Sequence, residues 1–194
     1  MISAPRTNTD KKISKFSSLR ETKEEELHII SAGPSARNFN WKSIRGKDIM
    51  TINDSIFYLP LKTLYHVYNE PLEIERERYK LMTRKFPFTH KFTTFDLPGW
   101  HQLVLYDDRN LAFLLAINLA IDLGYKKALL YGYDFDVIDG FIHWWDIDPE
   151  KDNNIISKKK DLVRKQQDIF DEFLEKIDGK IEIQKIKVEN LNGK

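Results

Sequence analysis

The chain has 194 residues, of which 41% are hydrophobic and 31% are charged, and its formal net charge at pH 7 is +1. This length suits about one domain, and the composition is that of an ordinary globular protein rather than of a disordered chain. The near-zero charge argues neither for nor against a nucleic-acid partner, so any basic patch has to be local.

The chain contains no cysteine, which excludes disulfides, thiolate metal sites and cysteine nucleophiles and is consistent with a reducing compartment. No apolar run approaches the roughly 18 residues that a membrane-spanning helix needs. The first residues also lack the apolar core of a signal peptide. We therefore expect a cytoplasmic protein without a membrane span.

Residues 1–26 are polar and rich in Ser, Thr, Lys and Glu, which predicts a flexible or loosely docked N-terminal arm. The alternative is a basic arm that touches an anionic partner through Lys11, Lys12, Lys15 and Arg20. Residues 27–194 are expected to form a single nucleotide-binding α/β domain.

Short apolar runs alternate with helical patterns after residue 26, which is typical of a Rossmann-like, mostly parallel sheet with helices on both faces. The predicted strands are 27–32, 48–53, 63–68, 90–95, 127–133 and 181–188, and the predicted helices are 71–85, 110–123 and 158–177. The helix over 110–123 is apolar nearly all round and should be buried, with Asp107, Asp108 or Asn110 as its cap and Gly124 at its end. In open sheets of this kind, ligands bind beyond the carboxyl ends of the strands.

The first strand runs into Ser31-Ala-Gly-Pro-Ser35, a break that suits a phosphate-binding turn. Gly33 permits close approach of the backbone, Pro34 fixes the turn, and the amides of Ser35 and Ala36 would point outward beside the Ser35 hydroxyl. A purely structural turn uses the same residue types, so both interpretations remain open.

Asparagines follow the second and third strands, at Asn53 and Asn69. An asparagine amide at a strand end can pair with a base or a ribose, whereas Asn69 before Pro71 also suits a helix cap. Two such residues in register with the Gly-Pro-Ser turn favour a nucleotide pocket. Arg109 is a candidate for a ligand phosphate, or for an ion pair with a neighbouring aspartate.

The stretch after the fifth predicted strand carries several reactive groups. Asp134 and Asp136 form an Asp-x-Asp pattern that can hold a divalent metal on a diphosphate. His143 is a candidate general base, because imidazole gains and loses a proton near neutral pH. Trp144 and Trp145 either stack on a sugar or base or belong to the core.

Several segments resemble, in the same order, the small bacterial lipo-oligosaccharide sialyltransferases (glycosyltransferase family 42-like) and related sugar-transferase-like proteins of bacteria and phages. The similar segments are HIISAGPSARNFN, MTINDSIFYLP, YNEP, RNLAFLLAINLAIDLGYKKALLYGYDF and DIFDEFLEKIDGKIEIQKIKVEN. They cover roughly residues 27–190.

The resemblance implies a Rossmann-like domain with a short lid, and a glycosyltransferase that moves a sugar from a nucleotide-sugar donor, usually a cytidine monophosphate sugar, to an acceptor hydroxyl. It implies no required cofactor and no metal. It implies that His143 is the base and that Gly33, Ser35, Asn53, Asn69 and Arg109 line the nucleotide site. We add Asp134 and Arg109 as catalytic candidates, and Pro34 and Tyr133 as donor-binding candidates.

The sequence departs from the family at Ala32, where the family has Asn, and at Ala112, where it has Ser. His143 also lies well upstream of the predicted helix 158–177, and the lid is shorter. Alternatives therefore stay open: a uridine diphosphate sugar with a metal at Asp134 and Asp136, a hydroxylated DNA base as the acceptor in a phage, a non-catalytic nucleotide-binding module, or a metal-dependent nucleotide pyrophosphoryl enzyme. The oligomeric state is not predicted.

Overall fold

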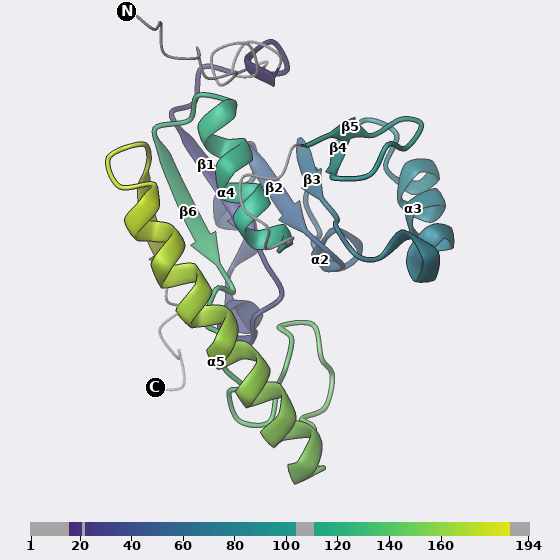
Figure 1. Cartoon of the computed structure of the whole chain (residues 1–194), viewed down its shortest axis with the longest axis vertical. Helices are drawn as coiled ribbons and strands as arrows, with labels where there is room; N and C mark the ends of the chain where they lie inside the picture. The colour runs from purple at the N-terminus through teal and green to yellow at the C-terminus, as the bar shows by residue number, and fades with distance from the viewer. Residues whose placement is uncertain (1–15, 21, 104–110, 187–194) are drawn as a thin grey trace, which may run out of the picture.

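The computed structural model describes residues 16–20, 22–103 and 111–186, and these residues form a seven-stranded sheet in the order β5-β4-β3-β2-β1-β6-β7 (Figure 1). Every strand pairing is parallel. The strands are β1 Glu26–Ile30, β2 Ile49–Ile52, β3 Tyr65–Val67, β4 His90–Thr93, β5 His101–Gln102, β6 Lys127–Tyr131 and β7 Glu182–Ile186. The predicted Rossmann-like class is confirmed, and the sheet is wholly rather than mostly parallel.

The strand order reverses at β1, which pairs with β2 on one side and with β6 on the other. Ile30 is the register partner of Thr51 in β2 and of Tyr131 in β6. The chain therefore leaves the carboxyl ends of β1 and β6 side by side at the topological switch point, where doubly wound folds bind ligands.

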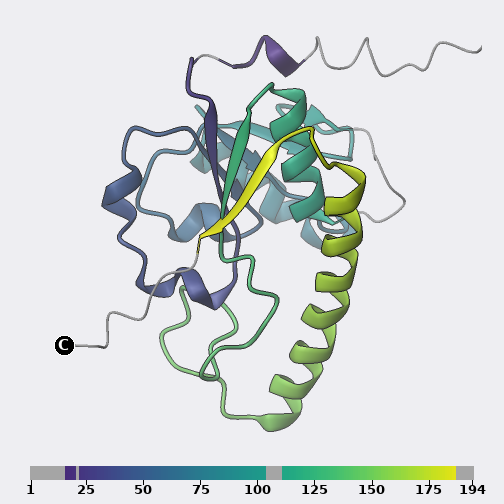
Figure 2. The ribbon, with the colours of Figure 1, turned by 90° about the vertical axis from the view of Figure 1, so that its left-hand side faces the viewer.

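Two helices, α4 Ala112–Asp122 and α5 Asn153–Lys176, cover one face of the sheet (Figure 2). Alternate strand residues point toward them because successive side chains of a strand face opposite ways. Leu27, Ile29 and Leu130 pack there with Phe170 and other apolar residues of the helices in the largest buried cluster.

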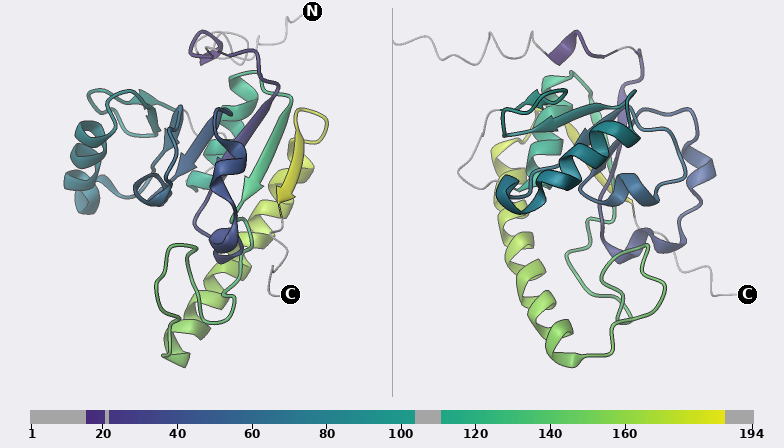
Figure 3. Two further views of the ribbon diagram at one scale, coloured as in Figure 1. Left: turned by 180° about the vertical axis from the view of Figure 1, so that it is seen from behind. Right: turned by 90° about the vertical axis from the view of Figure 1, so that its right-hand side faces the viewer.

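The opposite face carries the 3-10 helices η1 Pro34–Asn38 and η2 Trp41–Ile44 (Figure 3). Ile30, Leu129 and Tyr131 pack there against Trp41 and Trp144. The helices α2 Ser55–Tyr58 and α3 Leu72–Lys85 enclose a third cluster, which consists of Ile56, Tyr68, Tyr79 and Met82. Helical elements therefore cover both faces, as predicted.

The predicted helices are present, with shifted ends. Helix α5 begins at Asn153 rather than at residue 158, because the Asp152 carboxylate caps it by accepting a hydrogen bond from the Asn154 amide at 2.8 Å. His143 is therefore nearer to this helix than predicted. Gly124, with φ of +80°, follows the end of α4 as predicted, whereas the expected caps Asp107, Asp108 and Asn110 lie outside the described residues. No helix among the described residues is both long and apolar enough to cross a bilayer.

Part of the predicted N-terminal arm packs against the domain. Phe16 is buried in the main core, with its ring centroid 5.6 Å from that of Phe92. The Arg20 guanidinium lies over the Tyr125 ring and donates a hydrogen bond to the Gly124 carbonyl at 2.7 Å. Residues 16–20 are thus docked on the domain through Phe16 and Arg20. Lys11, Lys12 and Lys15 lie outside the described residues. The domain boundary at residue 26 stays a prediction.

Candidate functional site

The carboxyl ends of the strands open into a cavity of about 520 Å³, the main cavity, bounded by the loops after β1, β2, β3 and β6, the start of α4 and one side of α5. Several predicted site residues line it together, although they come from four different loops. These residues are Gly33, Asn53, Asn69, Tyr133 and His143.

The loops after β1 and β6 meet in direct backbone contact. The Gly33 amide donates a hydrogen bond to the Gly132 carbonyl at 2.9 Å. A Cβ atom on Gly33 would lie 2.4 Å from that oxygen and 2.6 Å from a carboxylate oxygen of Asp134. Gly33 therefore lacks a side chain because the β6 loop occupies the space beside it.

The turn after Gly33 is closed by Asp134. This carboxylate accepts hydrogen bonds from the Ser35 amide, at 2.7 Å, and from the Ser35 hydroxyl. The Ala36 amide donates to the Gly33 carbonyl, and Pro34 is buried in the first turn of η1. The donors expected to point outward to a phosphate are thus satisfied within the protein, and a phosphate would have to displace Asp134. Burial raises the pKa of Asp134 although the hydrogen bonds from Ser35 favour its charged form.

Asp134 and Asp136 have different partners. Asp134 faces Ser35, whereas Asp136 lines the main cavity and accepts a hydrogen bond from the Val137 amide at 2.7 Å. Within residues 16–20, 22–103 and 111–186, no three or more His, Asp or Glu side chains are grouped so as to hold a metal ion.

Asn53 ends β2 in a left-handed conformation, with φ of +50°. Its amide group donates a hydrogen bond to Glu70 Oε1 at 3.2 Å. Its Oδ1 atom is buried and has no hydrogen-bond partner among the described residues. A buried acceptor of this kind costs stability unless a ligand or water satisfies it.

Asn69 connects β3 with the end of β4. Its Oδ1 atom accepts hydrogen bonds from the Thr94 amide at 2.9 Å and from the Thr94 hydroxyl at 2.8 Å. The position before α3 belongs to Pro71, and no side chain in the described part of the chain caps that helix. The helix-cap interpretation of Asn69 is therefore wrong.

Tyr133 lines the main cavity and carries a second buried polar atom without a partner among the described residues. Only 4% of the residue is exposed, and its ring packs among Phe113, Phe135 and Phe170. Its hydroxyl has no hydrogen-bond partner among the described residues, and burial raises its pKa. The start of α4 lines the same cavity, and no described side chain caps this helix.

His143 borders the main cavity on a loop between β6 and α5. Its Nδ1 atom lies 3.3 Å from Asp146 Oδ1, while Asp146 Oδ2 accepts the amides of Ile142 and His143. The imidazole stacks on Trp145, with ring centroids 5.0 Å apart and planes within 4°. Because a carboxylate only accepts hydrogen bonds, Nδ1 carries the hydrogen and Nε2 is left to accept a proton.

The two tryptophans have different environments. Trp144 is buried in the core and donates a hydrogen bond from its indole to the Ser31 carbonyl at 3.0 Å. Trp145 stacks on His143 and also on Tyr58, at 4.6 Å. Trp144 is thus a structural residue, and Trp145 helps to orient the candidate base.

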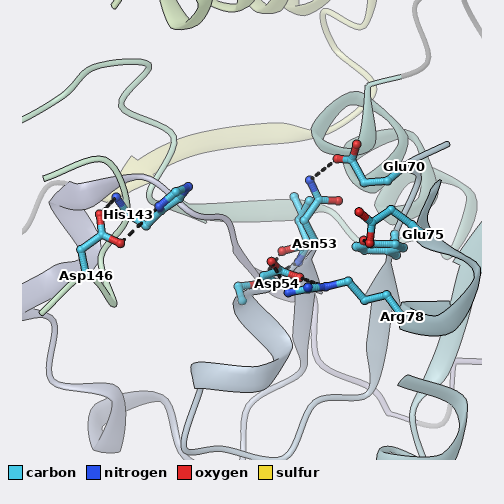
Figure 4. Close-up of polar contacts among 10 residues, drawn as sticks. Asn53, Asp54, Glu70, Glu75, Arg78, His143 and Asp146 are labelled. Atoms are coloured by element: carbon cyan, nitrogen blue, oxygen red, sulfur yellow. Dashed lines mark hydrogen bonds and ion pairs between the residues drawn. The ribbon is translucent and has the colours of Figure 1, made fainter. Parts of the chain in front are cut away.

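A second cavity of about 280 Å³, the side pocket, adjoins the main cavity and shares Ala32, Asn53, Glu70 and His143 with it (Figure 4). Its other walls are Asp54, Tyr68, Glu75, Arg78 and Trp145. The predictions missed Glu75 and Arg78, since a charged helix after a strand looks like a solvent-exposed surface, and they gave no role to Glu70 at the end of the third strand. They also missed Lys159, which among the described residues is the one lysine or arginine that lines the main cavity. Arg109 lies outside the described residues.

No protein-family model matches the chain, and no curated protein matches its sequence. Solved structures do match: the sialyltransferase CstII from Campylobacter jejuni in complex with the substrate analogue CMP-3FNeuAc has a TM-score of 0.53 and 21% identity, over 86% of this chain and 82% of that chain. The same sialyltransferase in complex with a trisaccharide acceptor and CMP has a TM-score of 0.53 and 19% identity, over 86% and 83%. The likeness establishes the shared fold and agrees with the resemblance seen in the sequence.

Proposed function

We propose that this chain is a glycosyltransferase that moves a sugar from a nucleotide-sugar donor to an acceptor hydroxyl. The observation that carries the proposal is the main cavity at the switch point, where His143, with Asp146 behind it, faces Asn53 at the end of β2. The similar fold of CstII in complex with CMP-3FNeuAc supports a cytidine monophosphate sugar as the donor.

The donor lies in the main cavity. The start of α4, where Ala112 and Phe113 line the cavity beside Tyr133, suits its phosphate, and Lys159 supplies a positive charge on the α5 side. Asn53 and Asn69 form the wall at β2 and β3, and Arg109 stays a predicted phosphate ligand. Gly33, Pro34 and Ser35 shape the wall at β1.

In the transfer step, His143 Nε2 takes the proton of the acceptor hydroxyl as that oxygen forms its bond to the anomeric carbon of the sugar. The bond between this carbon and the phosphate oxygen breaks, and its electron pair leaves with the nucleoside phosphate. Asp146 holds the imidazole in the required tautomer and orientation. Asp134, which the sequence predicts as catalytic, acts here as a positioning residue through Ser35.

Thermal unfolding with cytidine and uridine nucleotides, each with and without magnesium or manganese, tests the donor site. A bound nucleotide at about 100 times its Kd should stabilise the fold by about 2.7 kcal/mol. A shift with CMP that needs no metal supports the proposal. A metal-dependent shift with a uridine diphosphate favours the other donor, with Asp136 as the metal ligand to test.

The His143→Ala variant tests the base. We expect CMP to stabilise it like the wild type while transfer from a CMP sugar falls by about 10²- to 10⁴-fold. Asp148→Asn, an exposed change in the same loop, is the control and should keep its rate. Transfer by His143→Ala near the wild-type rate would exclude His143 as the base.

A non-catalytic nucleotide-binding module is the second candidate, because Asp134 occupies the donors of the Gly-Pro-Ser turn. Tight nucleotide binding without turnover of any donor sugar, in transfer or in hydrolysis, would favour this candidate over the enzyme.

A further inference from the structure

The side pocket lies where an acceptor has to approach. It opens beside the main cavity, and Glu70 and His143 belong to the walls of both. In Figure 4 the His143 ring points toward Asn53, with Asp146 on its far side and the carboxylates of Glu70 and Glu75 across the pocket. A hydroxyl group at this shared wall is therefore next to the candidate base, while the rest of its molecule has room in the side pocket.

The side pocket has more negative than positive charge. Asp54 and Arg78 form a two-point ion pair, with distances of 2.7 Å from Nε to Oδ1 and 2.5 Å from Nη2 to Oδ2. Glu70 and Glu75 form no ion pair with any described residue: Glu70 accepts from Asn53 and Glu75 accepts from the Tyr68 hydroxyl at 3.1 Å. Burial, and then the charges of Glu75 and Asp54, raise the pKa of Glu70.

The shared wall also contains an acceptor that no described residue uses. The buried Oδ1 atom of Asn53 has no partner among the described residues, and this asparagine is held in a left-handed conformation. Strained residues of this kind cluster at ligand sites. Together with the Glu70 and Glu75 carboxylates, Asn53 offers acceptors to a ligand that brings its own donors.

We propose that the side pocket binds the acceptor, and that this acceptor is a sugar without carboxylate, sulfate or phosphate groups, held by its hydroxyl or amino donors on Glu70 and Glu75. The inference rests on the proposed glycosyltransferase function and extends it to the class of acceptor. Acidic sugars are disfavoured because like charges at a binding site oppose binding. The same repulsion disfavours a phosphate backbone, and with it a hydroxylated DNA base as the acceptor.

Calorimetric titration of the CMP-saturated protein at pH 7.5 tests this selectivity. The probes are the methyl β-glycosides of galactose and glucose, their 2-amino-2-deoxy analogues and the matching uronic acids. We expect the neutral or the amino glycoside of at least one series to bind, and the matching uronide to bind at least 10-fold more weakly. A uronide that binds as tightly as its neutral partner overturns the proposal, as does the absence of binding by every probe.

Two matched variants locate the effect. Glu75→Gln keeps a partner for Tyr68 and removes one charge from the side pocket, so the penalty against the uronide should fall severalfold while the Kd for CMP stays unchanged. Glu73→Gln removes an exposed charge from the same turn of α3 and should leave both quantities unchanged. If the two variants change the penalty against the uronide equally, the side pocket is not the acceptor site. A protein that binds no nucleotide contradicts the proposed function itself, and the acceptor inference then fails with it.

Discussion

The loops after β1 and β6 and the ends of β2 and β3 face one cavity, yet they use their polar groups in opposite ways. At the β1–β6 contact, Gly33 bonds to Gly132 and Ser35 bonds to Asp134, so these groups satisfy one another. On the β2–β3 side, the Asn53 Oδ1 atom has no partner among the described residues. The contact of Gly33 and Ser35 with the β6 loop is therefore built for stability, whereas Asn53 offers its Oδ1 atom to a ligand.

This difference has an energetic consequence. Satisfied hydrogen bonds at the β1–β6 contact each contribute about 1 kcal/mol to the free energy of unfolding. The left-handed Asn53 and the burial of Glu70 near Glu75 and Asp54 act against folding. Substitutions on the first side should therefore change stability more than binding, and substitutions on the second side should do the reverse.

Gly33→Ala should have the largest effect on stability. The new methyl group would lie far inside contact distance of the Gly132 carbonyl oxygen, so the two loops have to separate. We expect a loss of about 3 kcal/mol in the free energy of unfolding, measured by urea denaturation. Gly179→Asn is the control, since this position has open space and asparagine adopts its left-handed conformation at only a small cost, so its loss of stability should be much smaller. Unchanged stability with lost CMP binding would instead make Gly33 a ligand contact.

Ser35→Ala removes one hydrogen bond to Asp134 and leaves a partly buried carboxylate with fewer partners. We expect the free energy of unfolding to fall by about 1–2 kcal/mol, while the Kd for CMP measured by calorimetry stays within about twofold. The opposite pattern, with intact stability and weakened CMP binding, would show that the turn binds phosphate after all.

The sequence predicts six of the seven strands, but not β5, whose two residues, His101 and Gln102, are too few to show a pattern. The same limit applies to η1, η2 and α2, which are too short for a helical period to appear. Because Asn53 and Tyr133 follow strands, we could predict that both would line one cavity. The sequence could not show that Ser35 donates its hydrogen bonds to Asp134, because the two residues are 99 positions apart and meet only through the β1–β6 pairing.

Asn53→Gly separates conformation from ligand contact on the β2–β3 side. Glycine takes a left-handed conformation without strain, which offsets the lost hydrogen bond to Glu70. We expect the free energy of unfolding to change by less than about 1 kcal/mol, while acceptor or CMP binding weakens. Asn53→Ala keeps the strain and loses the same hydrogen bond, so chemical denaturation should find it less stable than Asn53→Gly. Equal stabilities of the two variants would contradict this account.

Glu70→Gln should have the smallest effect, and its sign depends on pH. The pKa of Glu70 in the folded protein is raised above its ordinary value of 4.5. Glu70 therefore contributes to stability below pH 4.5, where its carboxyl is protonated in both states. This contribution is lost as the pH rises through the pKa of the folded state. Glutamine stays neutral throughout. The variant should match the wild type in Tm near pH 4 and exceed it by no more than about 2–4 °C at pH 8, while the exposed control Glu73→Gln shows no such trend. A lower Tm at pH 8 would mean that Glu70 is paired with a cation, and the β2–β3 side would then be as internally satisfied as the β1–β6 contact.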